Sequence, residues 1–158
     1  MPPKAISNAI TIADALLKIA KRQGKGLTPM QLVKLTYIAH GFALAVLDRD
    51  LFDDKIEAWK YGPVIPNLYH ATKKFGRNPI GFSMIDDAEI DLPDDVCDFL
   101  EEVFNKYGSL SGIQLSDLTH RIGSPWHQVY QGDRRGLEIP DDLIKEHYRK
   151  LYEANRAA

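Results

Sequence analysis

The sequence predicts a mainly α-helical protein: one compact domain of about six to seven helices around a buried central helix, with at most a short strand or hairpin. Three observations lead to this prediction. One long stretch stays apolar, several shorter segments carry apolar residues at steps of three and four, and glycines or prolines separate them. The length of 158 residues fits a single domain over 1–158 that can bury a core without disulfides.

The stretch 27–47 is apolar on nearly every face, so we expect it to be the buried central helix. Thr28 is the expected N-cap, a proline takes the first helical position, and Gln31 stands where a capping box needs it. Lys34 and His40 are the other clearly polar residues. The side chains expected to be covered by neighbouring elements are Met30, Leu32, Val33, Leu35, Tyr37, Ile38, Ala39, Phe42, Leu44 and Val46.

The remaining helices are predicted from caps, prolines and glycine stops, over 8–23, 66–76, 93–108, 111–123, 124–131 and from 140 onward. Ser111 and Gln114 form a second capping box, with Ile113 and Ile122 expected on the buried side of the helix that follows. Residues 51–59 are expected to be irregular or briefly extended. The segment 77–91 is the least regular; it fits either a loop or a short strand or hairpin arm around 80–85.

Charge is distributed unevenly around a formal net charge of −2. Residues 1–50 are net basic, whereas 84–102 carries nine carboxylates and no lysine or arginine. A duplex-binding protein is expected to present a basic face, so nucleic acid is an unlikely partner in this interpretation. The acidic run is either a solvated surface or a landing site for a basic protein partner.

The single cysteine, Cys97, excludes an intramolecular disulfide and a multi-cysteine zinc site, and a reducing cytoplasm fits this composition best. Three aspartates surround it and oppose thiolate formation, so we expect a buried structural cysteine. The N-terminal segment interrupts its apolar run with Asp14 and Lys18. Neither a signal peptide nor a membrane span is therefore expected.

The search for catalytic chemistry yields no motif, and no catalytic residue, metal ligand or cofactor is assigned. His120 and His127 are seven residues apart, but a Gly-Ser-Pro run between them interrupts any helix. No phosphate-binding loop or hydrolase signature occurs. A hydrolase using His120 or a carboxylate, and a helix-turn-helix repressor over 115–129, stay as alternatives, although the second helix of the latter nearly lacks basic residues.

Two short segments, 59–69 and 119–127, are dense in rigid amphipathic side chains. One interpretation is packing in the core and at corners. The other is a recognition surface, because aromatic side chains on a proline-fixed loop provide contact area at a low entropic cost. We predict that 59–64 and 119–126 lie close together, with the tryptophan rings partly or wholly buried. The candidate partner-binding residues are Trp59, Lys60, Tyr61, Gly62, Pro63, Val64, His120, Pro125 and Trp126.

Three blocks of the chain carry a family resemblance: LTPMQLVKLTYIAHGFALAV, IEAWKYGPVIPNLYHATKKFG and YGSLSGIQLSDLTHRIGSPW. Their order and the motifs KL..Y, EAW.YGPV and TH....PW resemble the Panacea domain family, with its SocA-like and phage-associated GepA-like proteins. The resemblance covers about 10–130. It implies a helical, non-enzymatic antitoxin that neutralises a toxin from an adjacent gene by direct contact, in some cases by presenting it to a protease.

The resemblance does not identify the toxin, because Panacea domains are paired with unrelated toxins. The alternative is a phage-associated regulator or adaptor that binds a host protein without a toxin partner. A membrane is not an expected partner. For the antitoxin interpretation, we expect the acidic stretch 86–102 to steer a basic toxin toward the loop 59–64.

Overall fold

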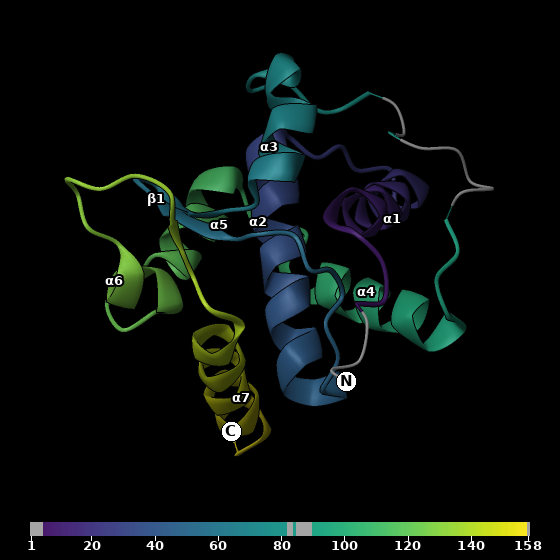
Figure 1. Cartoon of the computed structure of the whole chain (residues 1–158). Helices are drawn as coiled ribbons and strands as arrows, with labels where there is room; N and C mark the ends of the chain where they lie inside the picture. The colour runs from purple at the N-terminus through teal and green to yellow at the C-terminus, as the bar shows by residue number, and fades with distance from the viewer. Residues whose placement is uncertain (1–4, 82–83, 85–89, 158) are drawn as a thin grey trace.

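The computed structural model describes residues 5–81, 84 and 90–157 and has the predicted mainly helical architecture (Figure 1). Within these residues the α-helices are α1 (Ala9–Arg22), α2 (Pro29–Phe42), α3 (Pro66–Thr72), α4 (Asp94–Tyr107), α5 (Gly112–Thr119), α6 (Pro125–Val129) and α7 (Asp141–Ala157). Two short helical turns follow α2 and α3, a π turn η1 (Ala43–Leu47) and a 3-10 turn η2 (Lys73–Phe75). The strands are β1 (Glu57–Trp59), β2 (Gly62–Val64) and β3 (Leu137–Glu138).

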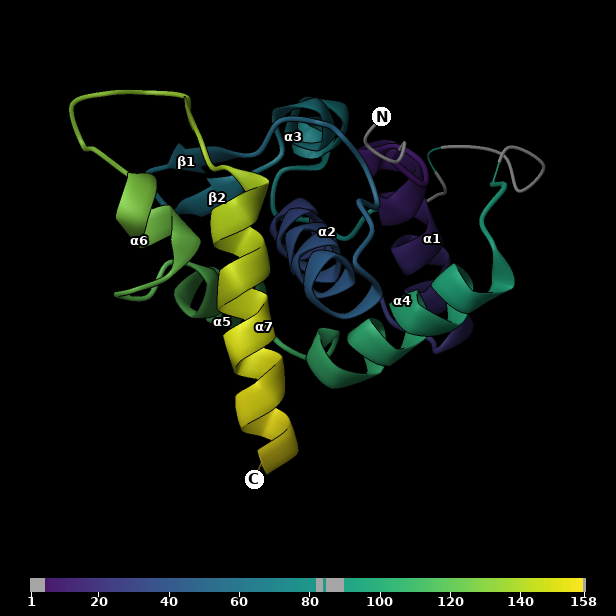
Figure 2. The same cartoon turned by 60° about the horizontal axis from the view of Figure 1, so that its bottom comes forward.

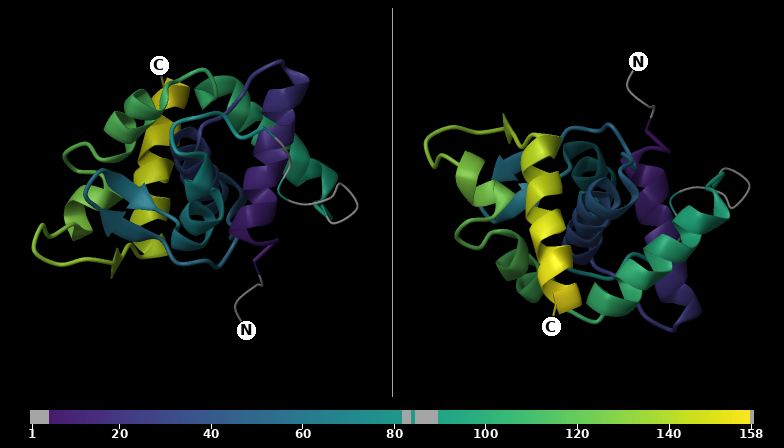
Figure 3. Two further views of the ribbon diagram at one scale, coloured as in Figure 1. Left: turned by 90° about the horizontal axis from the view of Figure 1, so that it is seen from above. Right: turned by 90° about the horizontal axis from the view of Figure 1, so that it is seen from below.

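Helix α2 is the centre of the domain, as predicted. Figures 2 and 3 show α1 and α4 on one side of it and α5, α7 and the β-hairpin on the other. The capping box is formed: the Gln31 amide donates to Thr28 Oγ1 over 3.3 Å, and Gln31 Oε1 accepts from the Thr28 amide over 2.9 Å. Because both bonds join residues three positions apart, the sequence alone is enough to place this helix start.

The polar residues of α2 are more deeply buried than its pattern predicts. Lys34 is covered by the hairpin, and His40 stacks on Phe52 at 4.2 Å while its Nε2 lies 3.0 Å from Asp141 Oδ1 of α7. Conversely, Met30 and Val46 are exposed, because they lie at the two ends of the helical segment. Their predicted burial is wrong.

The segment Pro29–Leu47 is long and apolar enough to cross a membrane by those criteria alone. In the structure 72% of it is buried inside the protein. Its apolar surface is covered by α1, α4, α5 and α7, as expected for a core helix.

Helices α1 and α4 cover the side of α2 away from the hairpin. Asn8 caps α1 by accepting from the Thr11 amide over 2.9 Å, and carboxylates occupy the first turn of α4, where the helix dipole favours them. Cys97 on α4 is exposed, so the expectation of a buried structural cysteine is wrong. Partial shielding and the carboxylates of Asp94 and Asp98 raise the pKa of its thiol.

Helix α5 begins with the predicted second capping box of Ser111 and Gln114 but ends at Thr119, four residues before Gly123. Ile113 and Ile122 are 80% and 89% exposed, so their predicted burial is wrong. The reason is that α5 is short: Leu115 and Thr119 face the core, Ile113 lies on the exposed side of the helix, and Ile122 lies beyond its end.

The only hairpin in the described residues is formed by β1 and β2, which pair antiparallel with β3 on the other edge of β1. The sequence instead suggested a strand or hairpin arm around 80–85. Residues 80, 81 and 84 are not in a strand, and the rest of that segment lies outside the described residues. Pro63 is compatible with a strand because β2 is an edge strand, where a missing backbone donor is tolerated.

Candidate partner-binding site

The β1–β2 hairpin has a two-residue turn, Lys60 and Tyr61, since Trp59 pairs directly with Gly62. Gly62 has a φ of +120°, a backbone conformation that residues other than glycine rarely adopt. It also lies against α2: a Cβ atom at this position would be 2.8 Å from Lys34 Nζ. Glycine is therefore required here for the backbone conformation, and its lack of a side chain leaves room for the Lys34 ammonium group.

A buried lysine holds this turn from below. Lys34 is 3% exposed, and its Nζ donates to the carbonyl oxygens of Pro63 at 2.8 Å and Tyr61 at 3.3 Å. Burial lowers the pKa of Lys34 to about 7 from its usual 10.5. The Tyr61 carbonyl also accepts from Ser116 Oγ of α5 over 2.6 Å. The hairpin turn is thus tied to two helices.

A second tie joins the hairpin to α6. The indole Nε1 of Trp126 donates to the Trp59 carbonyl over 2.5 Å. The Trp126 ring is only 8% exposed, meets His120 edge-on at 5.4 Å and stacks on Tyr130 at 4.5 Å. These contacts confirm that segments 59–64 and 119–126 lie together and that Trp126 is buried; Trp59 is half-buried.

The candidate residues separate into two groups by burial. One group is buried and supports the hairpin from inside the protein: Gly62, Pro63, Pro125 and Trp126. The others reach the surface: Lys60 and Tyr61 are exposed, and Trp59, Val64 and His120 are half-buried. Tyr61 is 65% exposed although its own carbonyl is bonded twice, which makes it a projecting aromatic side chain on a fixed backbone.

Other exposed apolar side chains gather around α5, and sequence reasoning missed them. Ile113 lies on α5, Ile122 lies in the turn that follows it, and the Met30 side chain lies against Gly112 at its start. We call the surface formed by Tyr61, Met30, Ile113 and Ile122 with His120 the hairpin face. The missed signal was that Ile113 shares one side of α5 with Gln114 and Asp117, and this polar side is the exposed one.

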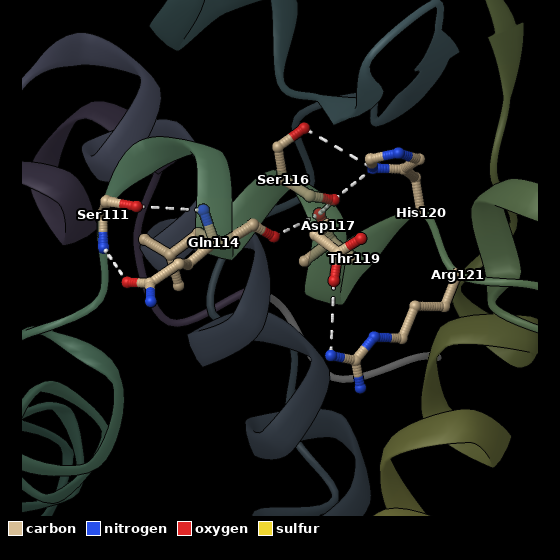
Figure 4. Close-up of polar contacts among 8 residues, drawn as sticks. Ser111, Gln114, Ser116, Asp117, Thr119, His120 and Arg121 are labelled. Carbon is tan, nitrogen blue, oxygen red and sulfur yellow. Dashed lines mark hydrogen bonds and ion pairs between the residues drawn. The ribbon is translucent and has the colours of Figure 1, made fainter.

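Ser116 lies one helical turn before His120, and Ser116 Oγ is 3.5 Å from His120 Nδ1 (Figure 4). The Ser116 hydroxyl donates to the Tyr61 carbonyl over 2.6 Å, so in this structure it supports the hairpin turn. The same Nδ1 is close to the Ser116 backbone oxygen. In the part of the chain that the structure describes, no group of three or more His, Cys, Asp or Glu side chains gathers as metal ligands.

The helix-turn-helix alternative does not fit the geometry of α6. This helix has five residues, none of them lysine or arginine, and its Trp126 points into the protein. A recognition helix must present side chains to base edges and phosphates. The short helix instead serves to fix β1 through the Trp126 indole.

The part of the acidic run that lies in α4 is not beside the hairpin. This helical part is on the opposite side of α2 from β1 and β2 in every view (Figures 1–3). Asp86, Asp87 and Glu89 lie outside the described residues. Attraction to α4 would draw a basic partner toward the far side of the domain, so the expectation that this run guides a toxin to the loop 59–64 lacks support from the fold.

Fold and site together define a small mainly helical domain with a β-hairpin whose turn is held by buried side chains and carries an exposed tyrosine. The family model described as antitoxin SocA-like, Panacea domain, matches residues 32–127, which contain most of α2, the hairpin, α3, α4, α5 and the start of α6. The chain belongs to this family. It is also 31% identical to the antitoxin SocA of Caulobacter vibrioides (strain NA1000 / CB15N) over 157 residues, covering 90% of this chain and 82% of that protein. No solved structure matches the chain.

Proposed function

We propose that this protein is an antitoxin that neutralises a toxin from an adjacent gene by binding it through the hairpin face. Family membership implies a toxin partner in general. The observation that carries the choice of surface is that Tyr61 projects from a turn held by Lys34 and Ser116. The helix that bears Ser116, α5, also carries exposed Ile113 and is followed by exposed Ile122. Exposed apolar patches are characteristic of protein interaction sites.

Rigidity of this surface favours tight binding. A loop that is disordered before binding loses conformational entropy in the complex, at about 0.5–1.5 kcal/mol for each immobilised flexible side chain. The hairpin turn has already lost that freedom, because the Tyr61 carbonyl accepts from two side chains and Gly62 lies directly on Lys34. Tyr61 then provides a large contact area with few rotatable bonds, as hot-spot residues commonly do.

Replacing Tyr61 by alanine is expected to weaken the toxin complex about thirtyfold, equivalent to about 2 kcal/mol, mainly through faster dissociation. The fold should be unaffected because the side chain is 65% exposed. Surface plasmon resonance with the co-expressed neighbouring gene product measures the dissociation rate. Thermal unfolding of the free variant measures its stability.

Tyr152 on α7 is the matched control, since it is also an exposed tyrosine but lies outside the hairpin face. Tyr152→Ala should leave the lifetime of the complex unchanged. A folded Tyr61→Ala variant whose complex persists as long as the wild-type complex would show that the turn is scaffold only.

We further propose that neutralisation takes place in the cytoplasm, in keeping with a single unpaired cysteine. Two modes are open to an antitoxin that binds in this way: blocking the toxin, or presenting it to a protease. Growth rescue by co-expression in a protease-deficient host separates them. Blocking predicts rescue without loss of toxin, whereas presentation predicts that the toxin accumulates and growth stops.

A further inference from the structure

An open pocket of about 530 Å³ lies beside the hairpin face, between β1 and the segment 130–136 that leads from α6 to β3. Lys34 and Ser116, which hold the hairpin turn, do not line this pocket, whereas Trp59 and Lys60 of the hairpin do. The segment is shaped by a tight turn in which the Arg134 amide donates to the Gln131 carbonyl over 3.0 Å. In Figure 1 this segment is the loop that arches next to β1.

The aromatic walls of the pocket are fixed. The Trp59 indole donates to Glu57 Oε1 over 2.9 Å, and its ring meets Tyr69 edge-on at 5.0 Å. On the other side, the Tyr130 ring lies at 17° to the buried Trp126 ring, which is itself bonded to the Trp59 carbonyl. A ligand would therefore bind to a preformed site, and its binding would not have to order the pocket walls.

The rim of the pocket is cationic. Lys60, Arg134 and Arg135 line it together with one carboxylate, that of Glu57, which is already engaged with the Trp59 indole. Among the residues that the structure describes, neither arginine forms a salt bridge. Guanidinium groups bind carboxylates through two parallel hydrogen bonds, so two unpaired arginines favour an anionic ligand.

We propose that this pocket receives an acidic segment of the toxin, with carboxylates on Arg134 and Arg135 and an apolar or aromatic side chain against Trp59 and Tyr130. The inference rests on the proposed function and deepens it, because Lys60 lines the pocket and its Nζ lies 5.5 Å from the ring centroid of Tyr61 in the hairpin face. Nucleic acid fits less well: the Glu57 carboxylate stands in the wall, and the chain as a whole has a net charge of −2.

The test compares charge reversal in the pocket with the same change elsewhere. Arg134→Glu combined with Arg135→Glu should weaken the complex with the neighbouring gene product at least about a hundredfold and reduce its salt dependence. Arg77→Glu, an exposed arginine beyond α3, should have little effect. All three arginines are exposed, so circular dichroism should show unchanged folding. Carbodiimide cross-linking of the wild-type complex should join Lys60 to Asp or Glu residues of the toxin.

The outcomes are distinguishable from failure of the proposed function. If the wild-type chain forms no complex with the neighbouring product, the proposed function fails and this inference with it. If the wild-type complex forms and the double reversal binds equally well, the pocket proposal is overturned while the antitoxin role stands. Binding of a single-stranded oligonucleotide by the wild type, lost in the double reversal while toxin affinity stays unchanged, would also overturn it in favour of a nucleic-acid site.

Discussion

Replacing Gly41 by alanine is expected to destabilise the whole domain by about 3 kcal/mol. Gly41 lies where α2 packs against α7: an added methyl group would lie 2.9 Å from Cγ of Tyr148 and nearer still to two other ring atoms. The ring cannot retreat, because it is 4% exposed and lies edge-on to Phe42 at 4.8 Å and to Tyr37 at 6.0 Å. This overlap outweighs the gain of about 1 kcal/mol that alanine brings within a helix.

Urea unfolding followed by circular dichroism measures this loss. Gly81→Ala is the matched control, since a methyl group there meets nothing within 4 Å. In a Tyr148→Leu background, where the ring is absent, the cost of Gly41→Ala should shrink, which a double-mutant cycle detects. Equal stabilities of Gly41→Ala and Gly81→Ala would show that α7 does not pack on α2 as described.

Replacing Lys34 by methionine is expected to remove a pH dependence of stability worth about 3 kcal/mol between about pH 6.5 and about pH 9.5. In the unfolded chain the amine has its usual pKa of 10.5, whereas in the folded protein burial lowers the pKa to about 7. Between these two values the unfolded chain binds one more proton. The free energy of unfolding of the wild type therefore rises with pH across this window, and that of Lys34→Met lacks this contribution.

Urea unfolding across that pH range gives the free energy of unfolding of wild type and of Lys34→Met. In the difference between the two values, the contributions of the other titrating groups cancel. Lys21→Met, at an exposed lysine on α1, is the control and should keep the wild-type slope. Lys34→Met also leaves the Pro63 carbonyl without its donor, so toxin binding should weaken even where the variant is folded. Parallel pH profiles for wild type and Lys34→Met would contradict the buried position of this amine.

The features of the fold that could be predicted are those fixed by residues close in sequence. Thr28 with Gln31, Ser111 with Gln114, and Ser124 before Pro125 each set a helix start through bonds that span three residues. The position and register of the hairpin were not predicted, because they depend on Gly62 approaching Lys34, a contact between residues 28 positions apart that has no local pattern. The π turn after Phe42 has no evident sequence signal either.

For the site, the sequence identified the two segments but not the role of each side chain. In the sequence, Trp59, Tyr61 and Trp126 are equivalent as rigid aromatic residues. Only the packing of the folded chain makes Tyr61 exposed and Trp126 buried. Ile113 and Ile122 were predicted as core because their spacing suits a helix that α5 is too short to form. Arg134 and Arg135 were not predicted as site residues, because only the pairing of β1 with β3 brings them beside Trp59.

Side-chain footprinting with a photoactivated carbene, applied to the free chain and to its toxin complex, tests the hairpin face most directly. Binding at this face predicts that labelling of Tyr61, Ile113 and Ile122, now 65%, 80% and 89% exposed, falls strongly in the complex. Labelling of Tyr152 on α7 should stay unchanged. Undiminished labelling of those three side chains in a fully formed complex, with protection on α1 or α4 instead, would contradict the assignment of the hairpin face as the toxin-binding surface.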